Sequence, residues 1–158
     1  MAPRSWTLAS RKMRVMSASL LARAVVSAIA AGQGIVPLFI DLNRSHATNP
    51  LWPAHARFHV VWQTFTLLFA AGVQVALLWW PGPLQIQRFY LAALLTALPL
   101  TGFLVALFAR GLYNGTLHDP NGIRPVRIEI AERIVEIDMN VVIVLFASAL
   151  LAAAVVLA

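Results

Sequence analysis

Four long apolar stretches, separated by short polar segments, make up most of this 158-residue chain. They cover residues 17–40, 59–80, 90–109 and 139–158. A helix needs about 20 apolar residues to cross a hydrocarbon core of about 30 Å, and each stretch has this length. The pattern predicts a single transmembrane domain, residues 1–158, with helices near residues 17–40, 55–80, 88–110 and 128–158.

The segments around these stretches predict how the helices begin and bend. Residues 1–16 form a basic tail that we expect to be loosely ordered. Pro53 suits the first turn of the second helix, where its missing N–H costs no hydrogen bond. The letters PGPL at 81–84 are typical of a tight turn. The letters GQG at 32–34 would let the first helix bend or pack closely against a neighbour.

Polar residues inside the spans are expected to stabilise the helical bundle and its position in the membrane. Gln33 and Gln74 are predicted to form hydrogen bonds between helices. Arg23 is predicted to extend its side chain towards the nearer membrane interface. These interpretations assign no chemistry to the three residues.

The segment RIEIAERIVEIDMN, residues 127–140, precedes the last apolar stretch. It places Glu129, Glu132, Glu136 and Asn140 at helical spacing, with isoleucines elsewhere on the surface. This pattern predicts the amphipathic first half of a long last helix.

The order of the spans brings the polar residues to one side. In a chain with four spans, the loops after spans one and three lie on the same side of the membrane. These loops and the adjoining helix ends hold all four histidines, His46, His55, His59 and His118. The predicted fold class is all-α, an integral membrane four-helix bundle with one polar side formed by the loops after spans one and three.

Composition supports lipid as the solvent for much of the chain. Hydrophobic residues account for 60% and charged residues for 11%, too few charges to cover a soluble domain. The net charge of +6 comes from basic residues scattered at the ends of the apolar stretches, where membrane proteins place them against headgroups. We expect membrane lipid as a partner and no nucleic acid. The absence of cysteine excludes thiolate metal sites and cysteine nucleophiles.

The histidines are the main candidates for chemistry. His55 and His59 are four residues apart on a predicted helix, so both imidazoles are able to bind one metal ion. A third ligand would be His46, His118 or a glutamate of the last helix. The alternative is that interfacial histidines bond loop carbonyls and water. His59 lies deeper, where an unpaired polar group is costly and an ionisable one is a functional candidate.

Other polar residues complete the predicted site. Glu136 is a candidate general base whose pKa burial would raise, unless the glutamates form ion pairs with Arg57, Arg110 or Arg133. Gln63 is one helical turn beyond His59 and would line the same cavity. Asn140 follows Glu136 on the predicted stripe and would orient a substrate.

The segment NPLWPAHARFHVVWQ, residues 49–63, resembles a family of small, uncharacterised four-span membrane proteins of bacteria. This resemblance implies no activity. Together with the basic tail, it predicts a multi-pass protein of the bacterial inner (cytoplasmic) membrane with a cytoplasmic N-terminus. A signal peptide is the alternative for the first span, but Arg23 interrupts its apolar region, so we expect the span to be retained.

The order of spans and the letters ARFH at 56–59 are also similar to styrene oxide isomerase. In that family the histidine of ARxH ligates haem b at a subunit interface of a trimer, and the ferric iron opens an epoxide to an aldehyde. The resemblance implies that His59 is the haem ligand and that Tyr113 or Tyr90 is the site tyrosine. The chain departs from the family at Phe65, where the family has asparagine, and lacks the family's aspartate in span three.

These observations predict a membrane enzyme acting on a small hydrophobic substrate, most concretely a redox-neutral isomerase. His59 with His55 would hold a metal or haem iron, Tyr113 or Glu136 would handle protons, and Gln63 and Asn140 would orient the substrate. Metal-free acid/base catalysis by His59 and Glu136 is a further possibility. The alternative is a non-catalytic membrane protein that binds lipid or a small molecule. A homo-oligomer, a trimer by the isomerase resemblance, is a possible assembly.

Overall fold

The computed structural model describes residues 4–118, 123–130 and 133–158. Its elements are α1 (Arg4–Ile40), α2 (Ala54–Trp79), α3 (Gln85–Ala109), the 3₁₀ turn η1 (Arg110–Leu112), β1 (Val126–Ile130), β2 (Arg133–Ile137) and α4 (Met139–Leu157). The four α-helices are all long and apolar enough to cross a membrane. The prediction of an all-α, multi-pass membrane bundle is confirmed, with one small hairpin added to it.

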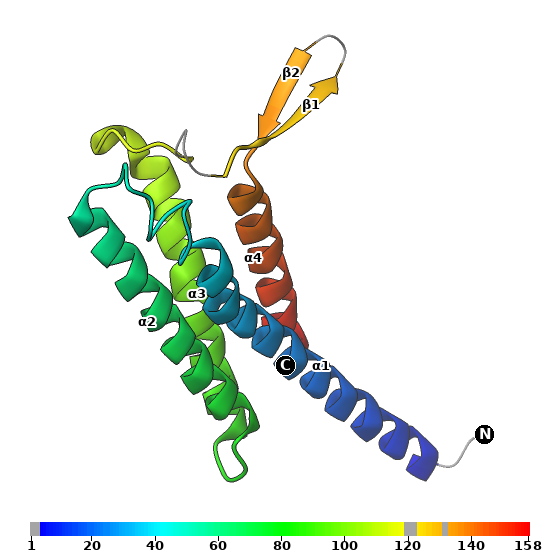
Figure 1. Cartoon of the computed structure of the whole chain (residues 1–158). Helices are drawn as coiled ribbons and strands as arrows, with labels where there is room; N and C mark the ends of the chain where they lie inside the picture. Colours follow the sequence, from blue (N-terminus) through cyan, green and yellow to red (C-terminus); the bar gives the residue numbers. More distant parts are fainter. Residues whose placement is uncertain (1–3, 119–122, 131–132) are drawn as a thin grey trace.

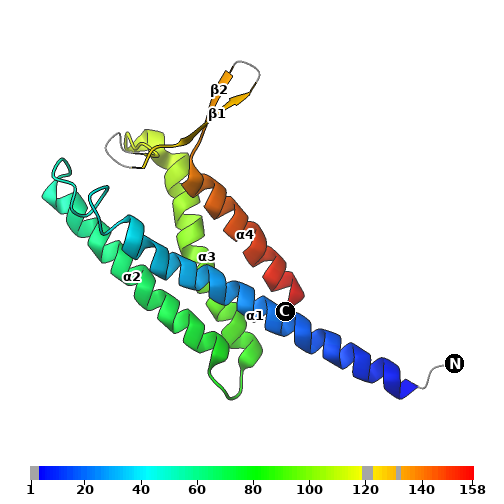
Figure 2. The ribbon, with the colours of Figure 1, turned by 45° about the vertical axis from the view of Figure 1, so that its right-hand side comes forward.

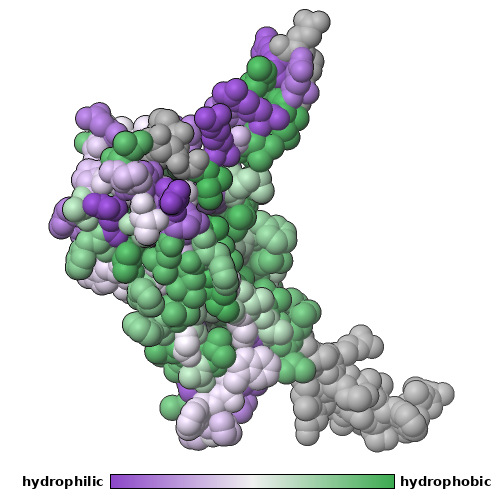
Figure 3. Space-filling model, in the orientation of Figure 1, coloured by the Kyte–Doolittle hydropathy of each residue, from purple (hydrophilic) through white to green (hydrophobic). Residues whose placement is uncertain are grey.

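Helices α1 and α3 form the centre of the bundle, because each of them contacts all three other helices. Helix α3 packs against both α2 and α4, and Figures 1 and 2 show α1 lying across these helices. Alanine is the most frequent residue of the core, and its small side chain lets the backbones approach closely. Members of the core include Ala22, Val26, Phe89, Ala92, Leu151 and Ala154. Many other large apolar side chains face outwards, as the hydrophobic surface in Figure 3 shows.

The tightest approach between α1 and α2 occurs at Gly34. A Cβ added there would lie 2.7 Å from the Ala71 Cβ, closer than real Cβ atoms are found, and 3.1 Å from the Leu68 Cα, which is tighter than most real Cβ contacts. Gly32 has nothing within 4 Å of the same position. The close packing expected from GQG is therefore confirmed, and it depends on the second glycine alone.

A polar cluster joins three helices inside the apolar core. The Gln33 Nε2 on α1 donates to the Thr96 carbonyl on α3 at 3.0 Å. The Thr96 hydroxyl shares its proton between the Ala92 carbonyl of its own helix at 2.8 Å and the Gln74 Oε1 on α2 at 3.3 Å. The interhelical hydrogen bonding predicted for both glutamines is confirmed. Such bonds fix the relative positions of helices where lipid offers no competing partner.

The Arg23 side chain reaches the end of α2, where its guanidinium bonds a backbone carbonyl that has no partner within the helix. The Arg23 Nε and Nη2 both donate to the Leu78 carbonyl, the former at 2.9 Å. The last carbonyls of a helix have no partner within it and are negatively polarised, so a cation there is favourable. The same guanidinium lies 5.0 Å from the centre of the Trp79 ring.

Two predictions about the helix boundaries are wrong. The tail is not loosely ordered, because α1 already begins at Arg4; no glycine or proline interrupts residues 4–31, so nothing in them stops the helix. The last helix does not begin near residue 128, because residues 126–130 and 133–137 form the antiparallel strands β1 and β2 and α4 begins at Met139.

The hairpin has a clear physical cause. Apolar and charged residues alternate in β1, and the apolar residues of both strands are the β-branched Val and Ile that favour strands. Arg127 pairs with Glu136 across the strands, and Ile128 pairs with Val135. Glu136 therefore shares no helical stripe with Glu129 and Asn140. Glu132, the remaining member of the predicted stripe, lies outside the described residues.

We predict that Gly34→Ala lowers the thermal stability of the detergent-solubilised protein, because the new methyl group must push α1 away from α2. Over-packing of this kind costs about 1–3 kcal/mol. Gly32→Ala is the matched control and is expected to leave the melting temperature unchanged or slightly higher. Equal melting temperatures for both variants would show that the helices do not approach at Gly34.

Candidate functional site

The loops after α1 and α3 lie at the same end of the bundle, which confirms the predicted polar side (Figure 1). Hydrophilic residues gather at this end in Figure 3, above a band of apolar surface. The loop after α1 carries His46 and the segment after η1 carries His118. Both histidines line one cavity, which we call the polar-end cavity.

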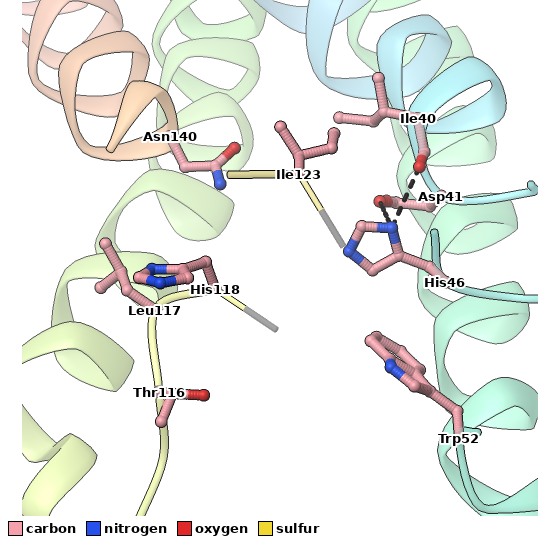
Figure 4. A pocket seen from close by; sticks show the side chains of 9 residues that line it. All are labelled: Ile40, Asp41, His46, Trp52, Thr116, Leu117, His118, Ile123 and Asn140. Carbon is pink, nitrogen blue, oxygen red and sulfur yellow. Dashed lines mark hydrogen bonds and ion pairs between the residues drawn. The ribbon is translucent and has the colours of Figure 1, made fainter. Parts of the chain in front are cut away.

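The polar-end cavity has a volume of about 250 Å³. One wall comes from the end of α1 and the loop that follows it, and the other from the segment after η1 and the first turn of α4 (Figure 4). Its lining residues are Ile40, Asp41, His46, Trp52, Thr116, Leu117, His118, Ile123 and Asn140. The cavity thus joins segments that are far apart in the sequence.

Short polar side chains hold the first loop in shape. The Asn43 Nδ2 donates to the Phe39 carbonyl at 2.7 Å, and the Asn43 Oδ1 accepts from the Ser45 N–H at 2.7 Å. The buried Asn49 accepts from the Leu51 N–H at 3.0 Å. Asparagine commonly bonds the backbone two residues on in this way, which creates a compact turn. These turns place His46 and Trp52 on the cavity wall.

His46 has two hydrogen-bonding neighbours behind its ring. Its Nδ1 lies 2.8 Å from the Ser45 Oγ and 3.1 Å from the Ile40 carbonyl oxygen. In the neutral tautomer that carries its proton on Nδ1, this nitrogen donates and the Nε2 has a free lone pair. Figure 4 shows the Nε2 facing the cavity, and the centres of the His46 and Trp52 rings are 5.0 Å apart in an edge-to-face arrangement. In that tautomer the lone pair of His46 points at any bound molecule.

Asp41 lies behind the same ring, with its Oδ1 3.8 Å from the His46 Nδ1. Burial of the carboxyl raises the pKa of Asp41 above its ordinary 3.8, and the charge of a protonated His46 acts in the opposite direction. The two groups are coupled, because a proton gained by the imidazole favours ionisation of the carboxyl. Perturbed, mutually facing titratable groups in a cavity are typical of functional sites.

The opposite wall offers hydrogen-bonding groups. Asn140, predicted to orient a substrate, lies in the first turn of α4 and lines the cavity. Its backbone N–H donates to the Asp138 Oδ1 at 2.8 Å, which caps the helix and fixes the residue. Thr116 and His118 line the same wall in Figure 4. A molecule in the cavity would lie between these groups and the His46 Nε2.

The predicted metal pair is elsewhere. His55 and His59 share one face of α2, as predicted, and their Nε2 atoms are 3.0 Å apart. Both side chains are exposed on the outside of the bundle, and neither lines the polar-end cavity. His46 and His118, the predicted third ligands, line that cavity instead. Among the described residues, no group of three His, Cys, Asp or Glu is arranged to hold a metal.

Gln63 does not lie at the polar-end cavity. It is exposed on α2, one turn beyond His59, so it accompanies the histidine pair and not the cavity. The expectation that His59, Gln63 and Asn140 act on one bound molecule therefore finds no support in their positions.

Neither candidate tyrosine reaches the polar-end cavity. The Tyr113 hydroxyl donates to the Ala106 carbonyl at 2.7 Å, and its ring lines an adjacent cavity of about 110 Å³. Gly115 allows this position, because a Cβ there would collide with the Tyr113 ring. Tyr90 lies near the start of α3, at the opposite end of the bundle.

Glu136 is engaged in the hairpin. Its Oε1 accepts from the Arg127 Nη2 at 2.8 Å and from the Arg127 Nε at 2.9 Å. An ion pair for this glutamate was the alternative to a general base, and the partner is Arg127, not Arg57, Arg110 or Arg133. Glu136 also lines a surface cavity of about 330 Å³ with His118, Arg124 and Arg127.

The sequence alone did not single out His46 with Asp41 as the central pair. The loop DLNRSH carries both residues, but their contact depends on turns made by Asn43 and Ser45. The only signal available beforehand was a histidine and an aspartate in one short polar loop that the topology places beside His118.

We predict that Asp41→Asn raises the thermal stability of the protein at pH 7 and removes the function of the cavity. The folded state binds a proton at Asp41 more tightly than the unfolded state, so stability is lost as pH rises above 3.8 through the folded pKa. The gain in melting temperature should shrink as pH falls towards 3.8. A less stable Asn variant at pH 7 would mean that the attraction between His46 and the Asp41 carboxylate outweighs the cost of burying that carboxylate.

The chain was compared with protein-family models, curated proteins and solved structures, and nothing matches. The resemblances noted in the sequence therefore remain predictions. The function has to be argued from the geometry of the polar end.

Proposed function

We propose that this chain is an integral membrane enzyme that isomerises a small hydrophobic molecule by proton transfer in the polar-end cavity. The observation that carries the proposal is the His46 ring, whose Nδ1 faces the Ser45 hydroxyl and the Ile40 carbonyl while its Nε2 faces the cavity. The proposal assigns the proton of the neutral ring to the Nδ1. A neutral imidazole with a free lone pair is a good general base near pH 7. In this proposal His46 takes the part first given to His59.

The proton transfer balances without a cofactor. The His46 Nε2 would remove a proton from one carbon of the substrate, and the resulting imidazolium would be stabilised by the Asp41 carboxylate and the Ile40 carbonyl. The imidazolium, whose proton exchanges with solvent water, would return a proton to another carbon, so the double bond shifts and no electrons are lost. Negative charge that develops on a substrate oxygen would be bound by Thr116 and Asn140 on the opposite wall.

The cavity limits the substrate. Its volume of about 250 Å³ is near the lower end of the range for small-molecule sites. Ile40, Trp52, Leu117 and Ile123 supply apolar contacts, and the polar groups lie together at one end of the membrane helices. These features suit a small molecule with one polar group, arriving from lipid.

A haem-dependent isomerase is the second candidate, and it concerns His59. The exposure of His59 on the outside of α2 suits a group bound between subunits, as the resemblance to styrene oxide isomerase implies. Ferric haem would supply a Lewis acid for epoxide opening. However, the His55 Nε2 lies 3.0 Å from the His59 Nε2, where iron would have to sit. Haem would fit only if the exposed His55 ring turned away.

The setting of the protein is part of the same proposal. We propose that it lies in the bacterial inner membrane with a cytoplasmic N-terminus, since the basic residues before the first span favour that orientation. The polar-end cavity would then face the outside. A homo-oligomer, a trimer in the haem version, would place the outer face of α2 at a subunit contact.

We predict that the purified protein exchanges substrate protons with solvent. In D₂O, membrane-partitioning β,γ-unsaturated ketones should gain deuterium and become conjugated, as followed by mass spectrometry. His46→Gln should slow this by about 10²–10⁴-fold, the usual contribution of a general base. His59→Gln is the matched control and should keep the rate, because His59 is outside the cavity.

Two outcomes of this experiment would contradict the proposal. If no ketone in the series exchanges or isomerises, or if His46→Gln is as active as the wild type, His46 is not the base. Binding of the same ketones without any turnover would favour the alternative, a non-catalytic membrane protein that binds small molecules.

The haem candidate predicts a Soret band in the purified protein, lost in His59→Ala and kept in His46→Ala. The physical reason is that iron loses its axial nitrogen only in the first variant. The measurement is an absorption spectrum with iron analysis after expression with added haem. A colourless, iron-free protein that is fully folded would remove this candidate.

A further inference from the structure

The exposed histidine pair on α2 has no part in the proton transfer proposed above. His55 and His59 lie in the first two turns of α2, on its outer face, away from the polar-end cavity. The positions of their ring nitrogens indicate what this pair is able to bind.

The Nε2 atoms of the two histidine rings lie close together. They are 3.0 Å apart, and the rings are nearly perpendicular, at 87°. Two nitrogens that bind one ion at about 2.0–2.1 Å lie roughly 2.9–3.4 Å apart for angles between 90° and tetrahedral. The observed separation falls in that range. The distance between the two nitrogens therefore suits a small ion bound by both rings.

Aromatic neighbours hold the deeper ring in place. His59 stacks on Trp62 at a centroid distance of 5.7 Å and an angle of 30°. The Phe58 ring meets the same imidazole edge-on at 6.0 Å. These contacts restrict rotation of His59, so little conformational freedom remains to be lost when a ligand binds. The outer sides of both histidines stay exposed for further ligands.

The donor set selects the kind of ion. Two neutral imidazole nitrogens suit Zn²⁺, Ni²⁺ and Cu²⁺, whereas Mg²⁺ and Ca²⁺ require oxygen ligands. Among the described residues, no Asp or Glu joins the pair to form a group of three. In the metal-free pair one Nε2 must donate a proton to the other, and an ion would take the place of that proton.

We propose that His55 and His59 chelate one borderline divalent ion, Zn²⁺, Ni²⁺ or Cu²⁺, at the polar end of α2. The other coordination positions are open to water or to an added ligand. This site is separate from the polar-end cavity and does not rest on the proton-transfer proposal. It also differs from haem ligation, which uses His59 alone and needs His55 to move away.

The test uses Cu²⁺ as the probe and the full chain in lipid nanodiscs, purified without a polyhistidine tag and stripped of metal. Electron paramagnetic resonance should show one Cu²⁺ per chain bound to two imidazole nitrogens. His55→Ala and His59→Ala should each weaken binding by at least about 10–100-fold, since even residues beyond the ligands have effects of that size. Zn²⁺ should displace the Cu²⁺ only in large excess, because nitrogen ligands bind Cu²⁺ more tightly.

His118→Ala is the matched control, because it removes an exposed histidine at the same end of the bundle and should leave Cu²⁺ affinity unchanged. Circular dichroism and gel filtration check that each variant keeps its helices. Equal Cu²⁺ affinity of the wild type and the His55→Ala/His59→Ala double variant would overturn the proposal. Equal loss in His118→Ala would overturn it too, because the metal would then lie elsewhere.

Discussion

The architecture of this protein follows from the inability of hydrocarbon to hydrogen-bond a polypeptide backbone. Each crossing must be a complete helix, so the chain changes side at every span. Four crossings put the segments after α1 and α3 at one end. That constraint brings His46 and His118, which are far apart in the sequence, to the walls of a single cavity (Figure 4). The polar chemistry is a consequence of topology.

Inside the bundle, small residues and a few hydrogen bonds replace the large apolar core of a soluble protein. Gly34 allows α1 and α2 to touch, and Gln33, Gln74 and Thr96 connect three helices. Arg23 completes the end of α2. These contacts are specific to particular positions, so they fix how the helices sit relative to each other. The loops that build the polar-end cavity depend on that arrangement.

Hydrophobic length was enough to predict the four helices and the shared polar end, and the spacing of four residues predicted that His55 and His59 share one face of α2. These signals were not enough for residues 126–130 and 133–137, because the glutamates at helical spacing also lie among β-branched residues that favour strands. Nor did the sequence single out His46 on the cavity wall, since its position depends on turns within the loop. Local pattern predicts elements, while contacts between loop atoms decide which histidine faces a cavity.

The central claim is that the loops after α1 and α3 lie on one side of the membrane. The chain has no cysteine, so there is no background labelling of native thiols. Single cysteines introduced at Thr48, Leu112 and Pro83 therefore report the side of the membrane on which each position lies. The measurement is labelling of intact cells with a membrane-impermeant maleimide, followed by labelling after lysis. We expect Thr48→Cys and Leu112→Cys to behave alike and Pro83→Cys, in the turn between α2 and α3, to behave oppositely. Opposite behaviour of Thr48→Cys and Leu112→Cys would contradict the account.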